Sequence, residues 1–150
     1  MAGGKQPKKW PPKGFPLVEG KHQLTDQWMV ELPSQFARRI EEGSLVLWRP
    51  GLTIWLDAWG NDHRSSRTAR LREIRSNVSE RATDVEETAG PKLSRLTYRL
   101  RDTSPDGEVD SIYNFVFSDA GHLQMAIYFD DPADVPTAYA IAASVGLVGP

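Results

Sequence analysis

The sequence predicts an α+β fold, a mainly antiparallel sheet of about six strands with about three helices packed on it. Three observations support this class. Segments in which apolar and polar residues alternate recur along the chain, as in half-buried strands. The links at 49–51, 103–108 and 119–121 are short, so the strands that they join should run antiparallel. Two later segments, 63–78 and 134–145, have the spacing or composition of helices.

The chain has 150 residues, of which 39% are apolar and 25% charged, as in one soluble globular domain. We expect a flexible basic arm rich in Pro and Lys over residues 1–16 and a single domain over 17–150. Cysteine is absent, which excludes disulfides and thiolate chemistry. No signal peptide or apolar run of about 18 residues is visible, so we expect a cytoplasmic protein without a membrane partner.

Charge is distributed unevenly. The net charge of −2 gives no support for bulk nucleic-acid binding. Residues 1–101 contain all 18 lysines and arginines and 12 acids, whereas residues 102–150 contain 8 acids. The simplest interpretation is that these two parts of the chain lie against each other, and the alternative is a dipolar binding surface.

The first elements expected are a strand and a short helix. Residues 22–32 predict a strand, because apolar and polar residues alternate near its end. Pro33 should end this strand. Ser34 then predicts the N-cap of a helix over 35–42, with Phe36 and Ile40 on its buried stripe, and Gly43 would terminate this helix.

Residues 44–60 predict a hairpin, around which we expect the fold to be organised. Pro50 and Gly51 suit a type II turn, since proline presets φ at its second position and glycine allows the positive φ of its third. Both arms are apolar on both faces, so they are covered on both sides or leave an aromatic patch open. The hairpin contains three of the five tryptophans, Trp48, Trp55 and Trp59.

Residues 63–78 predict a helix with Leu71, Ile74 and Val78 on its buried stripe. Residues 80–92 are polar and acidic and predict a loop. The surface of the helix opposite the stripe is basic, with Arg64, Arg67, Arg70, Arg72 and Arg75.

The last third predicts an antiparallel meander and a closing helix. The expected strands are 93–101, 109–117 and 122–129, separated by turn sequences. The helix should begin with Asp134 as N-cap and run to about Val145. The expected order is therefore strand, helix, two strands, helix, three strands, helix.

This order resembles the α/β/α sandwich of Mog/PsbP-like proteins. The likeness is carried by the hairpin at 44–59, the meander at 93–129 and the small-residue piece 141–144, and it covers most of residues 22–146. The resemblance implies a non-enzymatic interaction module, since that family includes a small-GTPase-binding protein and a photosystem extrinsic subunit. No family motif can be matched position by position. In general character the chain also resembles small uncharacterised bacterial proteins.

The sequence contains no HExxH, zinc-binding, Walker or GxGxxG motif. The three histidines are far apart and have no metal-ligand spacing, so we expect no metal site and no cofactor. Capping and turn formation explain the acidic residues near them. The alternative function is a small hydrolase or ligand-binding enzyme that uses Asp57, Asp62, His63 and His122 as an acid–base set.

The leading expectation is a non-enzymatic domain that binds a protein through tryptophan and arginine side chains, the residue types that dominate binding hot spots. The competing interpretation is that each tryptophan fills the core. The absence of known RNA-binding signatures disfavours nucleic acid. The partner and the oligomeric state stay open. The expected binding surface consists of Trp48, Arg49, Trp55, Trp59, Arg64, Arg67 and Arg70.

Overall fold

The computed structural model describes residues 9–149. These residues form one nine-stranded sheet, two α-helices and a single 3-10 turn. In chain order the elements are β1 (Leu17–Gln23), β2 (Trp28–Glu41), β3 (Ser44–Arg49), β4 (Leu52–Gly60), α1 (Arg67–Ser76), β5 (Thr83–Ala89), β6 (Ser94–Ser104), β7 (Gly107–Phe117), β8 (Gly121–Phe129), η1 (Pro132–Asp134), α2 (Val135–Ser144) and β9 (Gly146–Leu147).

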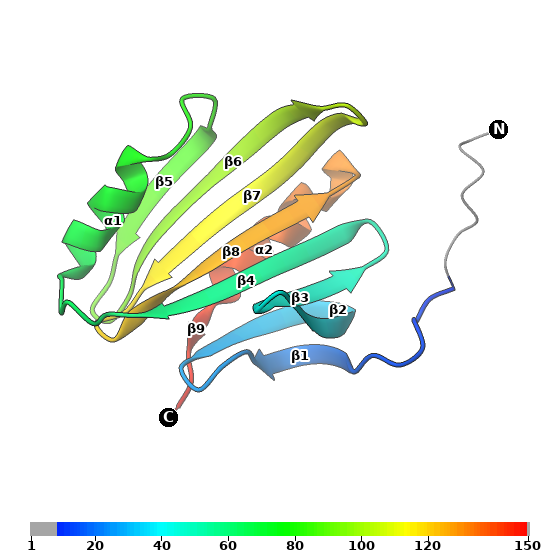
Figure 1. The fold of residues 1–150 in the computed structure, drawn as a ribbon, viewed down its shortest axis with the longest axis horizontal. Helices are drawn as coiled ribbons and strands as arrows, with labels where there is room; N and C mark the ends of the chain where they lie inside the picture. The colour runs from blue at the N-terminus through cyan, green and yellow to red at the C-terminus, as the bar shows by residue number, and fades with distance from the viewer. Residues whose placement is uncertain (1–8, 150) are drawn as a thin grey trace.

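All neighbouring strands of the sheet are antiparallel. The order across it is β1-β2-β3-β4-β8-β7-β6-β5, and β9 pairs with the start of β2. Figure 1 shows α2 behind the sheet and α1 beside β5 and β6 on the opposite side. The two helices therefore cover different faces, and α1 covers only one end of its face.

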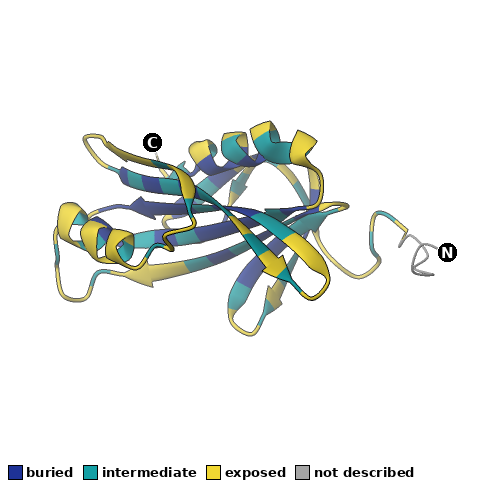
Figure 2. Ribbon diagram, turned by 90° about the horizontal axis from the view of Figure 1, so that it is seen from above, coloured by how far each residue is buried: buried dark blue, intermediate teal, exposed yellow. Residues whose placement is uncertain are grey.

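The main core lies on the α2 face of the sheet. Side chains on this face alternate with those of the other face along each strand, and Leu47, Ile54 and Ile127 form one fully buried row across β3, β4 and β8. From α2, Ala138 and Ile141 are both buried against this face. Small residues on α2 allow the helix to lie close to the strands, and Figure 2 shows its outer side exposed.

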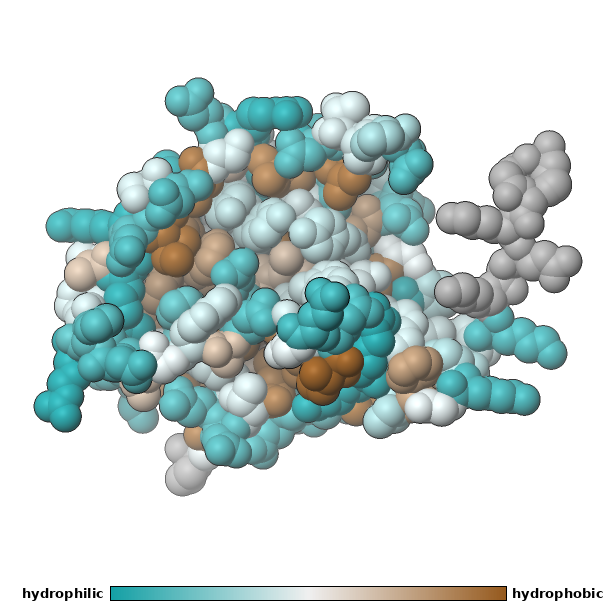
Figure 3. Space-filling model, in the orientation of Figure 1, coloured by the Kyte–Doolittle hydropathy of each residue, from teal (hydrophilic) through white to brown (hydrophobic). Residues whose placement is uncertain are grey.

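A second cluster lies under α1. Leu71 from the helix packs on Leu96 and Tyr98 of β6 and on Phe115 and Phe117 of β7. Beyond the helix this face carries half-buried aromatic side chains, among them Trp55, Tyr113 and Tyr128. In Figure 3, pale and brown residues lie over the middle of the face and hydrophilic residues surround it.

The predicted α+β fold with about six strands and three helices is wrong. The helix predicted over 35–42 is the second half of β2, because this segment pairs with β1 on one side and with β3 on the other. Pro33 does not end the strand. On the β1 edge of β2, Pro33 lies at a shift in the strand register. On the opposite edge, β9 pairs with residues 28–29 and β3 with residues 37–41, so Pro33 lies between them, in a stretch that pairs with neither. A proline that donates no ladder hydrogen bond is tolerated at such a place.

Two other elements differ from expectation. The polar segment 80–92 contains β5, an edge strand paired with β6, rather than only a loop. The helix predicted over 63–78 is shorter, because Ser66 caps α1 by accepting a hydrogen bond from the backbone N–H of Ala69, 3.0 Å away.

The hairpin, the meander and the closing helix are confirmed. Gly51 has a φ of +80°, as the predicted turn requires. The three meander strands appear as β6, β7 and β8, and α2 begins after Asp134. The arm predicted over 1–16 lies outside the described residues up to residue 8. Within its described part, the ring of Phe15 packs edge-on against Trp48, with centroids 5.0 Å apart.

Ion pairs confirm that the basic and acidic parts of the chain lie against each other. The best shielded pair joins Arg99 on β6 to Asp110 on β7, with an N–O distance of 2.6 Å and 14% exposure of each side chain. The other pairs that cross between the two parts are Arg49–Asp134, Arg67–Asp119 and Arg81–Asp102. Within residues 9–149, no helix has the length and apolarity to cross a membrane.

Candidate functional site

One end of β4 has a free edge. β4 pairs with β8 from Leu52 to Gly60, but β3 pairs with β4 only as far as Leu56. Figure 1 shows β4 continuing past the end of β3. Among the described residues, the edge from Asp57 to Gly60 therefore pairs with no strand on the β3 side. Such an edge presents backbone N–H and C=O groups to a partner.

An apolar hollow lies beside this edge, and we call it the Trp59 hollow. Its volume is about 340 Å³. Leu45 and Leu56 contribute buried apolar surface to it, while Ile40 and Trp59 flank it. Ile40 is 66% exposed and Trp59 48% exposed, which makes them the two most exposed large hydrophobic side chains of the described residues. Exposed apolar groups around a concave surface are typical of an interaction site.

Trp59 stands between two depressions. A second hollow of about 220 Å³ lies next to it and is lined by residues 25–28 and 58–60. The Trp59 ring stacks on His122 of the neighbouring strand, with centroids 5.0 Å apart and an angle of 18° between the rings. The stacking restricts the indole before any partner binds.

His122 is packed between two aromatic rings, and its chemistry follows from this position. Its other neighbour is Phe117, with centroids 5.4 Å apart. Burial lowers the pKa of His122, and the positive charge of Arg70 lowers it further. The Nδ1 atom of His122 is buried and finds no hydrogen-bond partner in the part of the chain that the structure describes. The ring therefore serves as a neutral platform for Trp59.

Hydrogen bonds between polar side chains fix residues at the rim of the Trp59 hollow. The Ser44 hydroxyl donates a hydrogen bond of 2.7 Å to Oδ1 of Asp57, which ties the end of β3 to β4. Arg38 lines the hollow and contacts Nε2 of His22 on β1 through Nη1, at 2.5 Å. Burial and the charge of Arg38 lower the pKa of His22.

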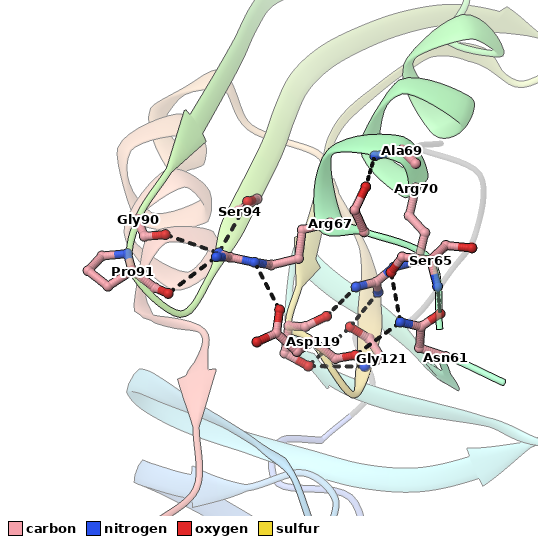
Figure 4. Close-up of polar contacts among 12 residues, drawn as sticks. Asn61, Ser65, Arg67, Ala69, Arg70, Gly90, Pro91, Ser94, Asp119 and Gly121 are labelled. Atoms are coloured by element: carbon pink, nitrogen blue, oxygen red, sulfur yellow. Dashed lines mark hydrogen bonds and ion pairs between the residues drawn. The ribbon is translucent and has the colours of Figure 1, made fainter. Parts of the chain in front are cut away.

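The arginines of α1 hold the helix in place. Figure 4 shows Arg67 and Arg70 directed toward backbone carbonyls and Asp119. Arg67 donates to the carbonyls of Gly90 and Pro91, at 3.0 and 3.2 Å, and its Nε lies 3.3 Å from Asp119. Arg70 donates to the carbonyls of Ser65, Ser118 and Gly121. These contacts join α1 to the turns before β6 and β8.

The structure brings together only part of the predicted surface. Trp48, Trp55 and Trp59 lie on the face that α1 partly covers, where Arg39 stacks over Trp48 at 4.4 Å from its centroid. Arg49 is on the other face, in an ion pair with Asp134. Arg64 is exposed beyond the end of β4.

The residues of the alternative enzyme site are not joined. Within residues 9–149, no hydrogen bond or ion pair links any two of Asp57, Asp62, His63 and His122. Asp62 and His63 are exposed, whereas His122 is enclosed by rings. No group of three or more potential metal ligands occurs in the described part of the chain.

Ile40 is the residue that sequence reasoning missed. Its spacing of four from Phe36 suggested the buried stripe of a helix. In β2, Phe36 is fully buried, whereas Ile40 lies near the β2–β3 turn and is exposed. The alternation of Arg39 and Glu41 with Ile40 is the strand signal that was present in the sequence.

No protein-family model matches the sequence, and a search of curated proteins also gives no match. The resemblance to Mog/PsbP-like proteins therefore stays a prediction.

The position of His122 predicts a pH dependence of stability. Because the folded state lowers the His122 pKa, protonation of the ring favours the unfolded state. Above the unfolded pKa of about 6.5 the ring is neutral in both states, so the free energy of unfolding has its full value. As the pH falls below about 6.5 toward the folded pKa, the free energy of unfolding decreases. His122→Phe should therefore lose less stability between about pH 7.5 and pH 5 than the wild type. Urea unfolding at both pH values measures this difference. An equal loss in the two proteins would contradict the proposed environment of His122.

Proposed function

We propose that the protein is a non-enzymatic binding domain whose partner is an extended segment of another protein. The segment pairs with the free edge of β4 and places an apolar side chain in the Trp59 hollow. One observation carries this proposal: Ile40 and Trp59, both exposed, flank an apolar hollow beside four residues of β4 that pair with no strand on the β3 side within residues 9–149.

The edge and the hollow suit different parts of one ligand. Strand addition supplies affinity through main-chain hydrogen bonds, and side-chain pockets supply specificity. The volume of about 340 Å³ is at the lower end of the range for small-molecule sites, so the hollow suits one or two side chains. An extended segment can use both features at once.

Trp59 has the properties of a binding hot spot. Tryptophan is enriched among residues that contribute most to interface energy. Since stacking on His122 already orients the indole, less side-chain entropy is lost when a partner covers it. The ring can therefore contribute most of its apolar area to affinity.

The charges near the hollow favour protein over nucleic acid. The two hollows are lined by two carboxylates and one guanidinium: Asp57 and Arg38 line the Trp59 hollow, and Asp26 lines the neighbouring one. These carboxylates would repel phosphates, and the hydrogen bonds of Arg67 and Arg70 to main-chain carbonyls occupy both side chains. A peptide with an uncharged apolar side chain avoids this repulsion.

A photo-crosslinking experiment tests the proposed site. A benzophenone side chain is placed at position 40 or, as a matched control, at position 17. Leu17 is also exposed, at 40%, but does not line the hollow. In lysate of the source cells, position 40 should give discrete protein adducts, and Trp59→Ala should abolish them. The crosslinked segment, made as a peptide, should then bind the purified domain.

Equal adducts from positions 40 and 17 would contradict the proposal, because they would indicate nonspecific contact. Adducts at position 40 that persist in Trp59→Ala would also contradict it. Competition by oligonucleotides, but not by the peptide, would assign the surface to nucleic acid instead.

A further inference from the structure

A cavity lies between α2 and strands β5 to β7, at the opposite edge of the sheet from β2 and β3, which line the Trp59 hollow. We call it the Arg95 cavity. Its volume is about 320 Å³, and its walls come from β5, β6, β7 and α2. A second, open hollow of about 480 Å³ is lined by the β5–β6 turn and shares Thr88 and Arg95 with it. The two spaces therefore adjoin at the Arg95 side chain.

Arg95 has unused hydrogen-bonding capacity. Its Nη2 donates to the carbonyl oxygen of Val145, which follows α2, at 2.6 Å. Its Nη1 is buried and has no hydrogen-bond partner among residues 9–149. No ion pair of the described residues includes Arg95, whereas Arg99, two residues later on the same strand, pairs with Asp110. A buried donor without an acceptor is costly, and native structures seldom leave one empty.

The electrostatics of Arg95 also favour an anion. Burial lowers the pKa of its guanidinium, because the positive charge is partly removed from water. A bound carboxylate would restore the favourable interactions of the charge through paired hydrogen bonds. Arginine is suited to this role by its planar group of donors.

The walls of the cavity are held by their own hydrogen bonds. Asn114 donates from Nδ2 to the Ala142 carbonyl oxygen at 3.0 Å and accepts from the Thr97 hydroxyl, also at 3.0 Å. Tyr139 is on the α2 wall, and burial together with the charges of Asp84 and Glu86 raises its pKa. The Tyr139 hydroxyl therefore keeps its proton and can donate to an anion.

We infer that the Arg95 cavity binds a small monocarboxylate with an apolar body. Arg95 takes the carboxylate, and the apolar part occupies the adjoining hollow, where Ala89, Pro91 and Leu93 supply apolar surface. Glu86 also lines the cavity and repels any anion, and because this repulsion is about twice as large for a dianion as for a monoanion, it disfavours phosphate dianions relative to a monocarboxylate. This site is separate from the proposed protein-binding site and does not depend on it.

NMR titration of the full chain with hexanoate tests the inference. We expect saturable shifts at residues 86–97 and 139–145. Hexan-1-ol and inorganic phosphate should each bind at least about tenfold more weakly, since one lacks the charge and the other carries too much. Arg95→Gln should weaken hexanoate binding by about tenfold or more. Arg101→Gln, which removes an exposed arginine of the same strand, should change it less than about twofold.

A second variant separates binding from folding, because Arg95 also holds the end of α2. Ala143 is exposed and lines the cavity, so Ala143→Trp should close the cavity without altering the core, and it should abolish hexanoate binding. The inference is overturned if hexanoate gives no saturable shifts. It is also overturned if Arg101→Gln weakens binding as much as Arg95→Gln, or if folded Ala143→Trp binds like the wild type.

Discussion

Gly121→Ala should destabilise the protein by about 2–3 kcal/mol, near the upper end of the usual cost of overpacking. A Cβ atom at position 121 would lie 2.1 Å from the carbonyl oxygen of Trp59 and 3.2 Å from Cα of Gly60. Both are backbone atoms of β4, so no side-chain rotation can relieve the contact. The turn cannot shift freely either, because the Gly121 carbonyl accepts hydrogen bonds from Ser118 and Arg70.

Gly60→Ala is the matched control, since Gly60 is the cross-strand partner of Gly121. There the nearest atom to an added Cβ is Oδ1 of Asp62, at 3.6 Å, which is ordinary contact. The two variants remove the same type of residue from the same rung of the sheet. Urea unfolding should show a clear loss for Gly121→Ala and a much smaller one for Gly60→Ala. Similar losses would mean that β4 and β8 do not approach closely at Gly121.

Local sequence signals were sufficient to predict the central strands of the sheet. The hairpin at 44–60 and the meander were predictable because turn residues and alternating apolar residues coincide there. The closing helix was predictable from its cap and its uncharged body. In each of these segments, the short-range pattern and the tertiary burial agree.

The edge strands could not be predicted in the same way. β5 has the sequence TDVEETA, and only Val85 is partly buried, so apolar alternation is missing. Its pairing with β6 is a backbone interaction that leaves no pattern in the side chains. For β2, the spacing of Phe36 and Ile40 fits a helix as well as a strand. Pairing with β1 and β3 decides between the two.

Only part of the candidate site could be predicted, because strand pairing, which the side-chain pattern does not show, determines which of its residues are exposed. Trp59 was identified from residue type, and its exposure follows from the place where β3 ends. Ile40 was assigned to a helix and therefore missed. Arg67 and Arg70 were expected at a binding surface, yet their donors serve main-chain carbonyls that only the folded sheet brings near α1.

Trp59→Ala should weaken binding of the crosslinked partner segment by about 2 kcal/mol or more, about thirtyfold in Kd. The indole contributes exposed apolar area at the centre of the proposed site, between two hollows. Since Trp59 is 48% exposed, its loss should affect binding more than folding. Calorimetric titration of each purified variant with the segment gives the Kd, and urea unfolding gives the stability.

The ratio of Kd values between Trp59→Ala and Leu17→Ala tests the proposed function most directly. Both changes truncate an exposed hydrophobic side chain, but only Trp59 borders the hollow and the free edge of β4. We predict about thirtyfold weaker binding for Trp59→Ala and a change of less than about twofold for Leu17→Ala. Equal affinities of the two variants for the segment would contradict the assignment of binding to this site.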